Sequence, residues 1–152
     1  MGSHCARLLV EDGWLDLLLC DINEAGLEKV AAPLRDKGAK VDLLAGEITD
    51  PAFTGRLLAA IGQREIGAVI HTAGIAPQMG EKDRILAINL DGTIALVDAI
   101  RPRMAKGSCA LLYASTAGHM PVTPELEALF EKPVPAGGTA ELVDKVPDSM
   151  AA

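Results

Sequence analysis

The sequence predicts a doubly wound α/β fold, in which a parallel sheet lies between two layers of helices. Short aliphatic runs typical of buried strands recur along residues 3–115. They alternate with segments whose apolar residues have helical spacing, and this alternation generates parallel sheets with right-handed crossovers. Aromatic residues make up only 3% of the 152 residues, so the core must be aliphatic.

The expected elements follow one another in order along the chain. Strands are expected at 15–20, 40–45, 67–72 and 108–115. Helices are expected at 3–13, from Asn23 to Gly38, from Asp50 through Ile61, and over 81–104. Asn23 and Asp50 are placed as N-cap residues, and Pro51 suits a first helical position because it lacks an amide hydrogen.

The stretch after residue 117 breaks this pattern. Residues 118–152 hold five prolines and a Gly-Gly pair, with short helical candidates at 124–131 and 139–145 and no further strand. We therefore expect residues 1–117 to form the nucleotide-binding part of one domain. Residues 118–152 are expected to form a lid or insertion of the same domain.

Composition narrows the possible partners. The net charge of −7 and the lack of a basic cluster argue against nucleic acid and anionic membrane surfaces. No apolar stretch approaches the roughly 20 residues of a membrane span, so a cytoplasmic protein is expected. The three cysteines lie in apolar contexts, where buried reduced thiols are expected.

Acidic residues follow the first two strands. Asp21 and its neighbour Ile22 end the first strand, and Glu47 and Ile48 follow the second. An acid at the first position can accept hydrogen bonds from an adenosine ribose and repel a 2′-phosphate. It could equally cap a turn or hold the ribose of S-adenosylmethionine, and Glu47 could be a solvated loop carboxylate.

Further motifs lie at the ends of the later strands. "HTAG" at 71–74 follows the third strand, "INLDG" places Asn89 three residues before Gly92, and "YASTAG" joins Ser115 to Gly118. Together with the acids after the first two strands, these motifs resemble the short-chain dehydrogenase/reductase family. The family's loop usually reads Asn-Asn-Ala-Gly, so His71 and Thr72 depart from it.

The resemblance implies a Rossmann-like fold and an NAD-dependent oxidoreductase that acts on a secondary alcohol or ketone. It implies catalytic roles for Ser115 and Asn89. The implied cofactor-binding residues are Gly2, Asp21, Ile22, Glu47, Ile48, His71, Thr72, Ala73 and Gly74. Asp21 favours NAD over NADP. Gly2 would be the last glycine of the family's cofactor loop, although "MGSH" is also typical of a cloning leader.

Two family elements have no counterpart in the sequence. The family's first strand would precede Met1, and its strands after the catalytic serine would follow Ala152. The catalytic Tyr-x-x-x-Lys is also missing, since Tyr113 precedes Ser115 and is the only tyrosine. We therefore expect a fragment that is inactive alone; the alternatives are a non-catalytic or vestigial nucleotide-binding protein and an S-adenosylmethionine-binding protein.

Two further expectations concern metals and assembly. His4 and His119 have no partners at ligand spacing, so no metal site is expected. The segment 81–104 resembles a helix through which the family forms oligomers. Its face with Ala95, Asp98 and Ala99 is a possible homo-oligomer interface.

Overall fold

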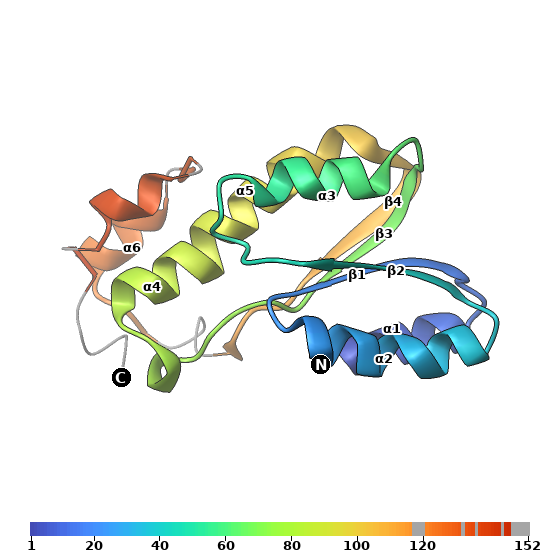
Figure 1. The fold of residues 1–152 in the computed structure, drawn as a ribbon. Helices are drawn as coiled ribbons and strands as arrows, with labels where there is room; N and C mark the ends of the chain where they lie inside the picture. The colour runs from blue at the N-terminus through green and yellow to red at the C-terminus, as the bar shows by residue number, and fades with distance from the viewer. Residues whose placement is uncertain (117–120, 132, 136, 144, 147–152) are drawn as a thin grey trace.

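The protein is a layered α/β structure in which helices cover both faces of parallel strands (Figure 1). The computed structural model describes residues 1–116, 121–131, 133–135, 137–143 and 145–146. The strands are β1 (Asp16–Asp21), β2 (Lys40–Ala45), β3 (Ile66–His71) and β4 (Met104–Leu112). The α-helices are α1 (Gly2–Glu11), α2 (Glu24–Asp36), α3 (Phe53–Ile61), α4 (Lys82–Leu86), α5 (Gly92–Ile100) and α6 (Pro124–Phe130). The predicted α/β fold with parallel strands is thus confirmed.

The strands form two separate pairs. β1 pairs with β2 in parallel, with Leu17 opposite Val41, and β3 pairs with β4 in parallel, with Ile70 opposite Leu111. Helices α1 and α2 lie on one side of the strands, and α3 and α5 lie on the other (Figure 1). Within the described residues, no strand joins β1 to β3, so the molecule contains two small sheets.

The β1–β2 sheet is packed on both faces. On the α1–α2 side, Leu17 and Val41 pack against a cluster that includes the fully buried Ala31. On the opposite side, Leu18 and Leu44 contact the cluster built by α3 and α5. This matches the general behaviour of parallel strands, which are buried on both faces.

The β3–β4 sheet is packed mainly against the α3–α5 layer. Ile66 and Val69 contact the cluster of Phe53, Leu57, Ile61, Leu96 and Ile100. The partner strand β4 is largely accessible, and Leu111 and Leu112 are exposed. A register irregularity between Ile66 and Ala68 further distinguishes this pair from the regular β1–β2 ladder.

Several element boundaries differ from those expected. The segment 81–104 is broken into α4, a π-helical turn η2 (Ala87–Asp91), α5 and a 3₁₀ turn η3 (Arg101–Arg103). Asp50 precedes the N-cap of α3, which is Ala52, and accepts a hydrogen bond from the amide of Ala52 at 2.9 Å. Asp50 lies outside the helix because an aspartate side chain can accept a hydrogen bond from the backbone amide two residues later, which forms a turn before the helix begins.

The C-terminal segment packs on α4 and η2. Leu126, Leu142 and Val146 form an apolar cluster that contacts Leu86 and Leu90. The carboxylate of Asp91 accepts hydrogen bonds from Gly137 N at 2.9 Å, from Thr139 N at 3.3 Å and from the Thr139 hydroxyl. The helix expected at 124–131 is present as α6, and the one expected at 139–145 is a 3₁₀ turn, η5 (Gly138–Glu141). Whether these residues act as a lid stays a prediction.

The expectation of buried cysteines was wrong. Cys20 and Cys109 are exposed and Cys5 is half-buried. All three lie on elements that border the space between the two sheets or the uncovered side of β4, where the described residues supply no covering layer. Although the Cys20 residue as a whole is exposed, the atoms packed around its thiol desolvate it and raise its pKa to about 11, and the Asp21 carboxylate adds to this shift.

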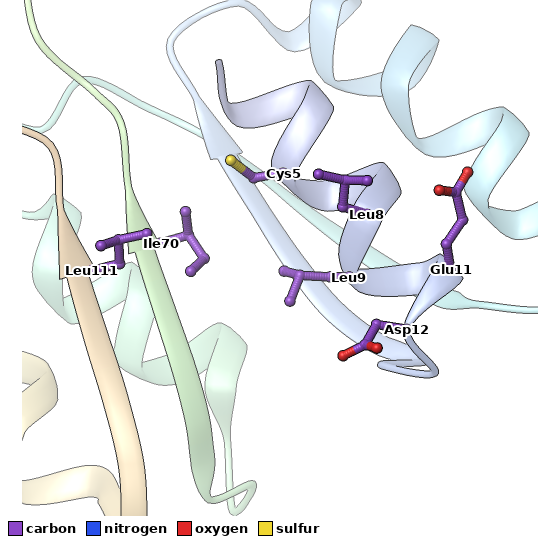
Figure 2. Close-up of a pocket in the computed structure, with 7 residues that line it drawn as sticks. All are labelled: Cys5, Leu8, Leu9, Glu11, Asp12, Ile70 and Leu111. Carbon is purple, nitrogen blue, oxygen red and sulfur yellow. The ribbon is translucent and has the colours of Figure 1, made fainter.

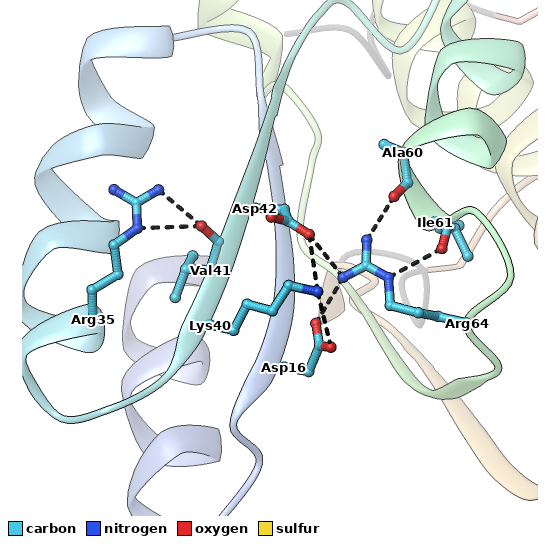
Figure 3. A network of polar contacts seen from close by, with 8 residues as sticks. All are labelled: Asp16, Arg35, Lys40, Val41, Asp42, Ala60, Ile61 and Arg64. Atoms are coloured by element: carbon cyan, nitrogen blue, oxygen red, sulfur yellow. Dashed lines mark hydrogen bonds and ion pairs between the residues drawn. The ribbon is translucent and has the colours of Figure 1, made fainter.

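A charged cluster connects the β1–β2 sheet to the loop before β3 (Figure 3). The Arg64 guanidinium lies 2.7 Å from Asp16 and 2.8 Å from Asp42, and Lys40 approaches both carboxylates. Arg64 also donates to the carbonyl oxygens of Ala60 at 2.6 Å and Ile61 at 3.0 Å, which end α3. One side chain thereby ties the end of α3 to the starts of both strands.

Candidate functional site

The residues expected to form a site gather at the carboxyl ends of the strands. Asp21 ends β1, Glu47 follows β2, His71 ends β3 and Ser115 follows β4. The amino terminus of α1 lies at this same end of the molecule (Figure 1). In open α/β sheets this edge is where ligands bind.

The start of α1 closely approaches the loop after β3. A Cβ atom added to Gly2 would lie only 2.8 Å from the Thr72 hydroxyl oxygen. A larger residue at position 2 would therefore push the Thr72 side chain away from α1. Met1 provides no side-chain cap for the helix. The first amides of α1 are therefore available to an anion, which a helix amino terminus favours through its dipole.

Asp21 is exposed, and one of its carboxylate oxygens is already engaged. Oδ1 accepts a hydrogen bond from the backbone amide of Asn23 at 2.9 Å, which forms the turn into α2. The Asn23 side chain in turn caps α2 by accepting from Gly26 N at 3.0 Å. The structure thus bears out the turn role that the sequence left open. It also leaves Oδ2 accessible for a ligand hydroxyl, and Ile22 beside it is 65% exposed.

Glu47 and Ile48 differ in their surroundings. Glu47 is exposed, and its carboxylate lies 4.0 Å from the Arg84 guanidinium. Ile48 packs against α5, where a Cβ on Gly92 would lie 2.8 Å from its Cγ2 atom. Ile48 therefore holds the loop after β2 against the α3–α5 layer. It also borders the carboxyl-terminal edge of the strands.

His71 is a buried polar residue at the end of β3. It is 8% exposed, and its Nε2 lies 2.8 Å from the hydroxyl oxygen of Thr93. That hydroxyl donates to the Asn89 carbonyl at 2.9 Å, so Nε2 must carry the hydrogen and donate to Thr93. Burial lowers the pKa of His71 below its ordinary value, which favours the neutral ring.

Asn89 holds the loop after β3 in a fixed position. Its side-chain oxygen accepts from Ile75 N at 2.8 Å, and its side-chain nitrogen donates to the Ile75 carbonyl at 2.9 Å. Gly74 lies against this amide, since an added Cβ would lie 3.2 Å from Asn89 Oδ1. Asn89 is part of the π-helical turn η2, and such turns are frequent at functional sites.

Thr93 was not among the residues singled out from the sequence. It joins the hydrogen bonds of His71 to those of Asn89, so both ends of the loop 72–75 are tied to the same helical turn. The available signal was its spacing, four residues after Asn89, which places a hydroxyl near the Asn89 carbonyl in a helix. Ala73 and Gly74, between the two tethers, are exposed.

Ser115 lies in the exposed segment that follows β4. Two residues earlier, Tyr113 Oη lies 3.5 Å from the sulfur of Cys5 on α1. That hydrogen bond raises the pKa of Tyr113, so the phenol stays protonated. Gly118, the last residue of the serine motif, and His119 lie outside the described residues. Among the residues that the structure describes, no group of three His, Cys, Asp or Glu side chains could hold a metal ion.

Comparison with known proteins identifies the family. A family model described as enoyl-(acyl carrier protein) reductase matches residues 1–128. The chain belongs to the short-chain dehydrogenase/reductase family. It is 34% identical over 130 residues to the pikromycin polyketide synthase component PikAIII of Streptomyces venezuelae, a match that covers 78% of this chain and 8% of that protein.

Solved structures of the family share the fold. NAD⁺-bound xylitol dehydrogenase superposes with a TM-score of 0.67 at 24% identity, covering 94% of this chain and 56% of that one. A short-chain dehydrogenase from Sphingobium yanoikuyae in complex with NADPH gives a TM-score of 0.55 at 25% identity, covering 67% and 43%. This short-chain dehydrogenase/reductase chain thus spans about half the length of the solved structures that it matches.

The part of the chain that the structure describes contains no helix long and apolar enough to cross a membrane.

Proposed function

We propose that this chain forms the cofactor-binding part of an NAD-dependent oxidoreductase that moves hydride between the cofactor and a secondary alcohol or ketone. Asp21, the tethered loop 72–75 and the uncapped amino terminus of α1 converge at one sheet edge, and this convergence carries the proposal. Bound NAD would supply the hydride acceptor, and the protein would supply binding and orientation.

The residues present fit a dinucleotide. The accessible oxygen of Asp21 would accept hydrogen bonds from an adenosine ribose, and its charge would repel the 2′-phosphate of NADP. The first amides of α1 would face the pyrophosphate, with Gly2 permitting close approach beside Thr72. Ile22, which is exposed next to Asp21, and Glu47 with Ile48 would border the adenine.

The loop after β3 would back the cofactor on the nicotinamide side. Its position is fixed before any ligand binds, because His71 and Asn89 tie both of its ends to η2 and α5. A fixed loop lowers the entropic cost of binding. Ser115 would donate a hydrogen bond to the substrate oxygen as negative charge develops there.

The isolated chain is proposed to be non-catalytic. Proton transfer to the carbinol oxygen would require a group comparable to the family's Tyr-x-x-x-Lys, which the sequence lacks. Tyr113 does not substitute for that tyrosine, since its hydroxyl bonds to Cys5 and its pKa is raised. We expect no oxidation of NADH above background with a panel of ketones, and turnover at ordinary enzymatic rates would contradict this part of the proposal.

Cofactor preference tests the binding role of Asp21. Wild-type protein should bind NADH at least about tenfold more tightly than NADPH, which corresponds to roughly 1.4 kcal/mol. Asp21→Ala should bring the two dissociation constants together, because the repelling carboxylate is gone. Titration calorimetry, or ligand-observed NMR for weak binding, gives both constants.

The control is Asp36→Ala, which removes an exposed carboxylate at the end of α2 and should leave the preference unchanged. A preference for NADPH in wild-type protein, or no response to Asp21→Ala, would contradict the assignment. Displacement of NADH by S-adenosylmethionine with comparable affinity would instead support a methyl-donor site.

A further inference from the structure

One carboxylate fastens the C-terminal segment to η2. Residues 121–131, 133–135, 137–143 and 145–146 are here called the strap, and Figure 1 shows its helix α6 beside α4. Asp91, the last residue of η2, accepts hydrogen bonds from Gly137 N at 2.9 Å, from Thr139 N at 3.3 Å and from the Thr139 hydroxyl. Hydrogen bonds to a charged acceptor are about twice as strong as those between neutral groups. This side chain therefore holds the strap by three donors.

The strap is shaped to present these donors. Gly137 has a φ of 77°, in the left-handed region that glycine adopts without strain. This turn directs two nearby amides at one carboxylate, as in other backbone turns that bind anions. Thr139 is only 3% exposed, so water cannot replace Asp91 as the partner of its hydroxyl. Loss of the carboxylate would leave a buried hydroxyl and two amides without their acceptor, which disfavours the docked strap.

The apolar part of the attachment is small. Among the described residues of the strap, the buried apolar side chains are Leu126, Leu142 and Val146, and they pack against Leu86 of α4 and Leu90 of η2. A segment held by few buried contacts opens locally at a low free energy. The hydrogen bonds to Asp91 therefore decide whether the strap stays docked.

The strap docks away from the open side of the two sheets. An apolar groove lies on that side between α1 and the β3–β4 sheet, lined by residues such as Leu8, Leu9 and Ile70 (Figure 2). No described residue of the strap lines this groove, since the buried residues of the strap pack on α4 and η2 instead. An effect of the strap on the loop after β3 is therefore transmitted through α4 and η2.

The turn that anchors the strap also holds the loop after β3. Asn89, two residues before Asp91, bonds to both the amide and the carbonyl of Ile75. Leu90, between them, packs against the strap. A π-helical turn is rare and occurs mostly as a single-turn insertion in an α-helix. The contacts of these three neighbouring side chains stabilise that uncommon backbone together, so losing the contacts to the strap weakens the contact to the loop.

We propose that Asp91 is a latch that couples the strap to the loop 72–75. The docked strap keeps η2 in the conformation in which Asn89 clamps Ile75, and opening of the strap loosens that clamp. Asp91 is a positioning residue, because it acts on the loop through Asn89. The role of this loop toward the cofactor rests on the proposed function, whereas its coupling to the strap does not.

Amide hydrogen exchange of the full chain, measured residue by residue by NMR, tests the coupling. Asp91→Ala should speed exchange of the Leu142 amide, which bonds to the Thr139 carbonyl in the strap. It should also speed exchange of the Ile75 amide at least about tenfold, because Asn89 Oδ1 no longer holds that amide firmly. The Gly46 amide, which bonds to the Asp21 carbonyl beyond β2, should exchange at its wild-type rate.

A second variant tests the latch from the side of the strap. Thr139→Val removes one hydrogen bond to Asp91 and keeps both amides, so exchange of the Ile75 amide should rise by about threefold. If Asp91→Ala also speeds exchange at Gly46, that variant has lost global stability, and the milder Thr139→Val decides. Asp36→Ala removes an exposed carboxylate from the end of α2, away from the strap, and should change none of these amides (Figure 1).

NADH binding is the second readout. Asp91→Ala should weaken it by about threefold to tenfold, because binding must then also order the loop. If wild-type protein does not bind NADH, the proposed function is wrong, and the exchange rates alone decide whether the latch exists.

Two results would overturn the latch. If exchange rises at Leu142 while Ile75 exchange and NADH affinity stay at their wild-type values, the strap opens without affecting the loop. If neither amide responds to Asp91→Ala or to Thr139→Val, Asp91 does not hold the strap. Either result leaves the proposed function standing when wild-type protein binds NADH.

Discussion

The β1–β2 sheet and the β3–β4 sheet are built from similar sequences but packed differently. Both contain parallel strands of aliphatic residues, yet β1–β2 is covered by α1 and α2 on one face and by the α3–α5 layer on the other. The β3–β4 sheet packs on the α3–α5 layer, and most residues of β4 are exposed. An aliphatic strand sequence is therefore not evidence of burial by itself, because the helices packed on each face of the strand determine how much of it is exposed.

The largest expected effect concerns core packing in the two sheets. Leu34 on α2 is only 3% exposed and packs against the β1–β2 sheet. Leu34→Ala should therefore lower the free energy of unfolding by about 3 kcal/mol. Leu111→Ala on β4 should cost less than about 1 kcal/mol, since that side chain is 47% exposed. Urea denaturation of both variants measures the contrast, and equal losses would show that β4 is covered in solution.

The next effect concerns the charged cluster that ties the sheets together. Arg64→Met should cost roughly 1–2 kcal/mol, because Asp16 and Asp42 lose a partner and two carbonyls of α3 lose a donor. Arg64→Lys should recover only part of this, since an ammonium cannot reach all four acceptors. Denaturant midpoints give both values.

The same cluster should respond to pH. Desolvation raises the pKa of Asp16, but hydrogen bonds from Arg64 and Lys40 outweigh it and hold that pKa below its usual range. A depressed carboxyl pKa contributes stability at neutral pH that is lost as the pH falls through the native value. The Arg64→Met penalty should therefore shrink in acid, and a penalty independent of pH would contradict the ion-pair explanation.

The smallest effect concerns His71, which ends β3 and hydrogen-bonds to Thr93 of α5. Because burial lowers its pKa, the unfolded chain binds a proton more readily than the folded one, so this residue costs stability as the pH falls below about 6.5. His71→Gln should make the loss of stability between pH 7 and pH 5 shallower than in wild type. Denaturant midpoints at several pH values measure this slope, and an unchanged slope in the variant would contradict the explanation.

The positions of several candidate-site residues could be predicted because these residues follow strand ends. Aliphatic runs at Asp16–Asp21 and Lys40–Ala45 fixed where strands stop, and parallel strands bring their carboxyl ends to one edge. That was enough to place Asp21, Glu47 and His71 together. It could not reveal that Thr93 joins His71 to Asn89, since this contact depends on how α5 crosses β3.

The sequence by itself determined the α/β class, the strand order along the chain and the residues at the strand ends, because these depend on local periodicity and motif spacing. Only the tertiary structure decided that the cysteines are exposed and that Thr93 joins His71 to Asn89. It also decided that a helix predicted over 81–104 bends through a π turn at Ala87–Asp91. The physical reason is that burial and strand pairing depend on which neighbours are present in space, and no local pattern in the chain specifies them.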